Sequence, residues 1–96
     1  MLLTARNYAK LTLAEREAML ERLAVTLERN ALSAAAEGND SLATVMGSVG
    51  AAILSVANDL AAGDVELAQD VIARALTLIA TFHVLHPTCP RGPAMH

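Results

Sequence analysis

The sequence predicts an all-α protein, a small antiparallel bundle of three helices that homodimerisation completes. Apolar residues recur at spacings of three and four along most of the chain, which keeps their side chains on one face of an α-helix. Short turns that contain glycine, asparagine or aspartate divide this pattern into three segments. Apolar residues make up 54% of the 96 residues and charged residues only 18%. One short chain has little interior in which to bury so many apolar side chains, which favours an oligomer over the alternative of a monomer with an apolar surface.

The first predicted helix, residues 12–37, follows an N-terminal arm over residues 1–11. Thr12 and Glu15 have the spacing of a capping box, in which each side chain accepts a hydrogen bond from the backbone N–H of the other residue. Apolar residues line one side of this helix and charged residues the other, so we expect one face in the core and one in water. Gly38 can adopt the left-handed backbone conformation that ends a helix.

The second predicted helix, residues 40–62, is the most apolar part of the chain and has no charged residue between Asp40 and Asp59. Its large apolar residues fall on one face and are Leu42, Met46, Val49, Ile53, Val56 and Leu60. The adjacent face carries small residues, which let another helix approach closely. Because no side of this helix is clearly polar, we expect neighbouring helices on both apolar faces.

The third predicted helix, residues 64–86, begins after a break at Gly63, with Asp64 as its N-cap. One apolar face of this helix is expected in the core. A second apolar row consists of Leu67, Val71, Leu78 and Leu85. Apart from histidine, no charged residue follows Arg74 in this helix. The tail, residues 87–96, contains all three prolines, and the first of them ends the helix.

The apolar faces of the second and third helices predict a homodimer in which these helices of two chains pack together. The residues expected at the interface are Leu42, Met46, Val49, Ile53, Val56, Leu60, Val71, Leu78 and Leu85. We also expect a charge-poor surface around Ser48 and Thr77 to bind a further, unidentified protein, because the centres of protein-binding surfaces are depleted in charge.

The composition argues against several classes of function. A net charge of -3 with no basic stripe is not expected of a nucleic-acid-binding protein. The chain has no phosphate-binding glycine loop and no serine near an activating histidine in sequence, so we expect neither an enzyme nor a cofactor. A membrane span is disfavoured as well, because residues 41–58 only reach the lower limit of spanning length and lack basic or aromatic anchors. The single cysteine fits a reducing, cytoplasmic location.

Two hypotheses for function remain. The first is a small regulatory or adaptor protein that inhibits or chaperones another protein through an apolar helical surface. Anti-activators, phage-encoded inhibitors and secretion chaperones share this profile of small size without an active site, which is an analogy of type and not of sequence. The alternative is a metal or thiol sensor that uses His83, His86 and Cys89, which follow one another at about one helical turn, although Pro87 interrupts the regular geometry.

Overall fold

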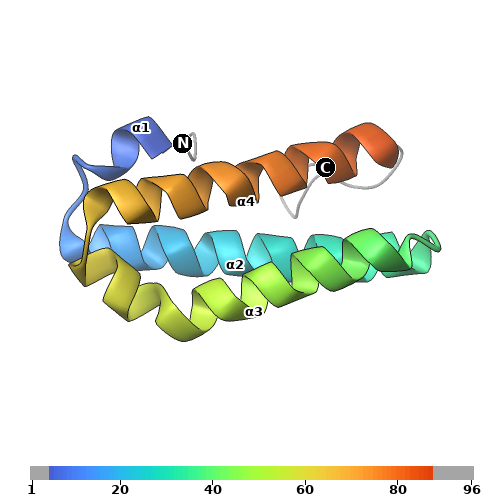
Figure 1. The fold of residues 1–96 in the computed structure, drawn as a ribbon, viewed down its shortest axis with the longest axis horizontal. Helices are drawn as coiled ribbons and strands as arrows, with labels where there is room; N and C mark the ends of the chain where they lie inside the picture. The colour runs from blue at the N-terminus through green and yellow to red at the C-terminus, as the bar shows by residue number, and fades with distance from the viewer. Residues whose placement is uncertain (1–4, 88–96) are drawn as a thin grey trace.

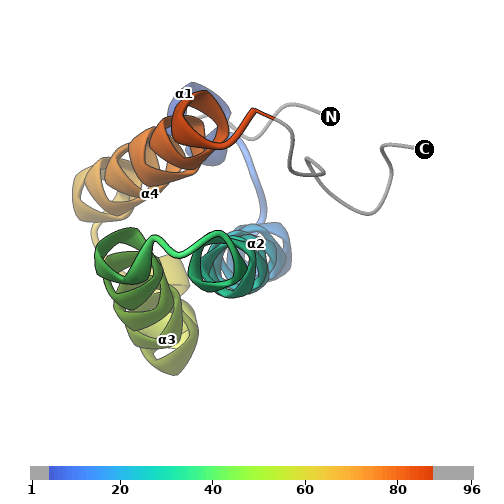
Figure 2. The same ribbon diagram turned by 90° about the vertical axis from the view of Figure 1, so that its right-hand side faces the viewer.

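The computed structural model describes residues 5–87, which form one short and three long helices. Their bounds are α1 Ala5–Tyr8, α2 Leu13–Ala36, α3 Asp40–Ala62 and α4 Val65–Leu85. The long helices run antiparallel to their neighbours in sequence (Figure 1) and occupy the corners of a triangle in the end view (Figure 2). The residues described contain no strand, so the predicted all-α bundle of three helices is confirmed. Each long helix begins and ends within one residue of its predicted range.

Local hydrogen bonds fix where the long helices begin. Thr12 Oγ1 accepts from the backbone N–H of Glu15 at 3.2 Å, and Glu15 Oε1 accepts from the backbone N–H of Thr12 at 2.9 Å, which completes the capping box. Asn39 and Asp64 cap α3 and α4, and each accepts through a side-chain oxygen from a backbone N–H of the first turn. Between α2 and α3, Gly38 has a φ of 84°, a conformation that other residues rarely adopt.

The core is formed mainly by α2, with contributions from every other helix. Its largest fully buried side chains are Tyr8, Leu20, Leu23, Leu27, Met46, Ile72 and Phe82. Each aliphatic side chain of this kind contributes about 1.5–3 kcal/mol when it is removed from water. The two long helices that follow α2 differ in how they pack: α3 lies close against α2, whereas α3 and α4 make few contacts with each other.

Small residues allow the close approach of α3 to α2. Gly50 is buried, and a Cβ atom at this position would lie 2.9 Å from Glu28 Cγ and 3.0 Å from the carbonyl oxygen of Ala24. The first of these atoms belongs to a flexible side chain, but the second belongs to the backbone of α2. A side chain at Gly50 would therefore push the two helices apart.

Gly50→Ala is expected to lower the melting temperature, whereas Gly47→Ala is expected to raise it. Both substitutions improve helix propensity by about 0.5–1 kcal/mol. At Gly47 the added Cβ meets only Ala31 Cβ at 3.8 Å, an ordinary van der Waals distance, so this gain is kept. At Gly50 the clash with the α2 backbone outweighs the gain. Thermal unfolding followed by circular dichroism measures both variants, and a stabilised Gly50→Ala would contradict the packing described.

The short helix α1 belongs to the arm for which the sequence predicted no structure, and it closes one end of the bundle against α4 (Figure 1). Tyr8 is fully buried there, and its hydroxyl donates to the carbonyl oxygen of Leu60 at 3.4 Å. The Arg16 guanidinium lies 5.2 Å from the centre of the Tyr8 ring and donates to the carbonyl oxygen of Ala9 at 3.0 Å. Contacts with distant parts of the chain therefore hold α1 in place.

Burial raises the pKa of Tyr8 above its ordinary value of 10.0, and the positive charge of Arg16 lowers it by a smaller amount. The folded state thus favours the neutral phenol. The stability that the neutral Tyr8 side chain contributes is fully present below pH 10.0. It is lost as the pH rises through the raised pKa, because the unfolded chain releases the phenol proton first.

The ionisation of Tyr8 can be followed by the absorbance of the phenolate, since the chain contains a single tyrosine. Tyr8→Phe is expected to remove the alkaline loss of stability, and an equal loss in that variant would refute the assignment.

Candidate protein-binding groove between α3 and α4

An apolar groove with a volume of about 430 Å³ lies between α3 and α4. The helix α3 packs mainly on α2 and makes few contacts with α4, and Figure 2 shows the three helices end on. The residues that line it are Val49, Ala52, Ile53, Ser55, Val56 and Leu60 of α3 and Leu67, Val71, Arg74 and Leu78 of α4. Arg74 is the one charged residue in this lining. The groove therefore presents two nearly uncharged helical walls to the outside.

The α4 wall follows from helical spacing. Leu67, Val71, Arg74 and Leu78 are separated by steps of four, three and four residues, which align them on one side of the helix. Leu67 is 55% exposed, and Val56 on the opposite wall is 41% exposed. Large apolar side chains that are this accessible on facing walls mark a surface suited to binding an apolar partner.

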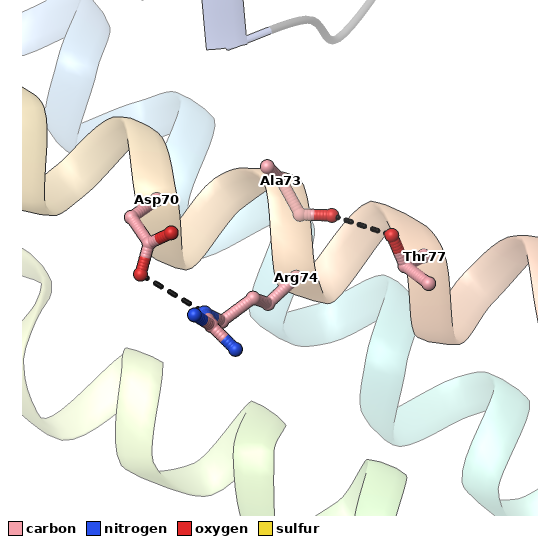
Figure 3. A network of polar contacts seen from close by, with 4 residues as sticks. All are labelled: Asp70, Ala73, Arg74 and Thr77. Atoms are coloured by element: carbon pink, nitrogen blue, oxygen red, sulfur yellow. Dashed lines mark hydrogen bonds and ion pairs between the residues drawn. The ribbon is translucent and has the colours of Figure 1, made fainter.

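The polar groups near the groove are largely satisfied within their own helices. Arg74 Nε donates to Asp70 Oδ2 at 2.9 Å, and Thr77 Oγ1 donates to the carbonyl oxygen of Ala73 at 3.0 Å (Figure 3). The hydroxyls of Ser55 and Thr81 also donate to carbonyl oxygens of the preceding turn. An exposed ion pair four residues apart contributes only about 0.3–0.5 kcal/mol. The hydroxyl protons of Ser55, Thr77 and Thr81 are therefore already used within α3 and α4, and these side chains can offer a partner only an acceptor oxygen.

The structure brings most of the predicted interface residues together. Six of them line the groove: Val49, Ile53, Val56, Leu60, Val71 and Leu78. Ile53 forms the base of the groove and is only 3% exposed, and Met46 is fully buried in the core. These two side chains hold the chain together and offer a partner little surface.

The remaining predicted interface residues lie outside the groove lining. Leu42 is half-buried against the core, Leu85 is exposed at the end of α4, and Ser48 and Thr77 are exposed. The predicted set also lacked Leu67 and Arg74, which line the groove. The regular spacing along α4 places both residues in the same row as Val71.

The residues of the predicted metal or thiol site have other contacts in the structure. His86 Nε2 lies 3.2 Å from Asn39 Nδ2, which links the end of α4 to the cap of α3. The His83 ring packs against Phe82, with 5.1 Å between ring centres. Cys89 lies outside the described residues. Within residues 5–87, no three histidine, cysteine or acidic side chains are placed so that they could hold a metal ion.

By length and composition alone, α3 and α4 are each long and apolar enough to cross a membrane. Buried helices of other proteins pass the same test, so this finding has little weight by itself. In each helix, however, only 22% of the most apolar 18-residue stretch is buried inside the chain. The remaining residues of these two helices are exposed or only partly covered by the rest of the chain.

No protein-family model, curated protein or solved structure matches this chain. No relative therefore indicates a function. The function is therefore inferred from the shape, apolar lining and charges of the groove.

Proposed function

We propose that this chain is a small non-enzymatic regulatory or adaptor protein that binds another protein in the groove between α3 and α4 and thereby inhibits or chaperones it. The observation that supports this proposal most strongly is the groove of about 430 Å³ with a single charged residue in its lining. The depletion of charge at the centre and the accessible apolar walls are the features of a protein-binding surface.

A helix is the element of a partner that fits this groove best. The groove runs between two helices that make few contacts with each other, and recognition of an amphipathic helix in an apolar groove is a common binding mode. The α4 wall extends from Leu67 to Leu78, which is about 17 Å of helix at 1.5 Å per residue. The groove therefore accommodates roughly three turns of a partner helix.

Self-association is proposed for the same surface. The homodimer predicted from the sequence would cover the groove whenever no other partner is bound. Because one groove accepts one occupant, a second copy of the chain and a different protein would compete for it. Regulation by exchange between these two complexes follows directly from that competition.

A valine-to-arginine substitution in the groove is expected to prevent capture of the partner, whereas the same substitution on the back of α2 is not. Val56 in the groove and Val25 on α2 are matched in exposure, at 41% and 44%. Val56→Arg introduces a long charged side chain into the apolar lining, and Val25→Arg joins a surface that is already charged. Affinity capture from native lysate followed by mass spectrometry compares both variants with the wild-type chain.

Circular dichroism is the control that both variants remain folded. A protein that is captured by the wild-type chain and the Val25→Arg variant but lost with Val56→Arg would support the proposal. Equal capture by the two variants would show that the groove is not the binding surface.

A further inference from the structure

We infer that the groove accepts an amphipathic α-helix whose apolar stripe is flanked by lysine or arginine side chains. This inference rests on the proposed function and specifies the class of partner. It follows from the charges of the two helices that form the groove, which are almost all of one sign.

The two helices that form the groove are strongly acidic as a unit. Residues 40–85 contain five carboxylates and one guanidinium, a net charge of -4 with histidine neutral. The carboxylates belong to Asp40, Asp59, Asp64, Glu66 and Asp70. All five side chains are exposed. The other long helix, α2, has a nearly balanced set of charges, so the acidic character is specific to the side of the groove.

Four of the five carboxylates lie near the end of the groove at which a short turn connects α3 to α4. Asp59 lies one turn from Val56 on α3, and Glu66 is adjacent to Leu67 on α4. Asp64 sits in the turn between the two helices, and Asp70 lies one turn before Arg74. If a partner helix bound in the groove, the residues on either side of its apolar stripe would lie close to these carboxylates.

The single cation of this region does not neutralise that charge. Arg74 is paired with Asp70 at 2.9 Å in the same helix. Asp59 and Glu66 form no ion pair within the described part of the chain. Both are therefore available to a lysine or arginine of the partner, and a bound helix would reduce the local solvent screening of these pairs.

The same charges weaken the binding of other occupants relative to a helix with basic flanks. A second copy has the same net charge of -4 on these two helices, and like charges repel, so its complex should be the weaker of the two. A membrane surface of anionic lipids would be repelled in the same way. A helix with basic flanks can pack its apolar stripe against the walls of the groove and place its lysine or arginine side chains near the carboxylates.

Binding of three synthetic peptides to the full chain tests this inference. Each peptide has about 18 residues, roughly 27 Å of helix, with the same leucine stripe and with lysine, glutamine or glutamate at the flanking positions. We expect the lysine peptide to bind most tightly and the glutamate peptide most weakly in fluorescence anisotropy. Added salt should reduce the advantage of lysine, because it screens exposed charges. The double variant Asp59→Asn with Glu66→Gln should reduce that advantage about threefold to tenfold, since two exposed ion pairs contribute that much.

A matched pair of variants shows whether the peptides occupy the groove. Val56→Gln combined with Leu67→Gln should weaken binding of all three peptides. Val25→Gln combined with Leu32→Gln makes the same chemical change at exposed positions of α2 and should leave binding unchanged. Glutamine adds no charge, so a loss confined to the first pair reports on the apolar walls.

The possible failures are distinguishable. Equal affinity for the lysine and glutamate peptides would overturn the basic class of partner and leave the proposed function standing. Absence of binding by every peptide, or binding that ignores the groove variants, would count against both. A chain dimer that only the groove variants dissociate and no peptide displaces would make the second copy the occupant. Binding to anionic phospholipid vesicles through the groove, without peptide binding, would assign it to a membrane surface.

Discussion

Ile53→Asp is expected to unfold the chain. Ile53 is 3% exposed and lies between the core and the base of the groove. Loss of a buried isoleucine costs about 2–5 kcal/mol, and an unpaired buried carboxylate adds several kcal/mol more. A domain of this size has a total stability of roughly 5–14 kcal/mol, so the substitution removes most or all of it. Far-ultraviolet circular dichroism measures the loss of helix.

Leu54→Asp is the matched control for this experiment. Leu54 is the next residue on α3, but its side chain is 46% exposed and does not line the groove. The same new charge at this position can stay in water, so we expect the variant to keep its helical spectrum and a cooperative melting transition. A folded Ile53→Asp variant would show that the side of α3 assigned to the core is wrong.

The fold could be predicted because its signals are local. The capping box of Thr12, the left-handed glycine at Gly38 and the cap at Asp64 each act within a few residues of the chain. The apolar spacing between them then requires helices that pack on one another. Short turns leave an antiparallel bundle as the arrangement in which consecutive helices are neighbours.

The groove could be predicted only in part, because its shape depends on the positions of whole helices. Helical spacing places Ile53 and Val56 in one apolar row, yet the first lies in the core and the second is exposed. Whether Ile53 or Val56 is accessible depends on the distance between α3 and α4. No sequence pattern within either helix determines that distance. The close approach of α2 at Gly50 is likewise a property of the packed helices, and it fixes α3 against α2 and not against α4.

The short helix α1 illustrates the same limit at the N-terminal end. Four residues provide no periodic pattern, and an isolated helix of this length is not stable in water. Its position depends on Tyr8, whose hydroxyl contacts the backbone at Leu60 far along the chain. Only the tertiary structure brings these two residues together.

The wild-type chain is expected to sediment as a dimer at micromolar concentration, and Val56→Asp combined with Leu67→Asp is expected to make it monomeric. A micromolar dissociation constant corresponds to about 8 kcal/mol, and each large aliphatic side chain buried contributes about 1.5–3 kcal/mol. Contact through the groove residues of both copies can therefore supply the required free energy. Both substituted positions are exposed in the single chain, so the variant should remain folded.

Salt dependence tests the charge repulsion expected in this dimer, and a matched control variant tests which surface it uses. Two copies that meet at their grooves bring together two pairs of helices that each have a net charge of -4, so added salt should strengthen the dimer by screening their repulsion. A lysine-flanked helix bound at the same place should respond in the opposite direction. Leu32→Asp is the control, because it adds a charge to an exposed position of α2 and should leave the dimer intact. A wild-type chain that sediments as a monomer would refute the homodimer, and the groove would then be open to a different protein at every concentration.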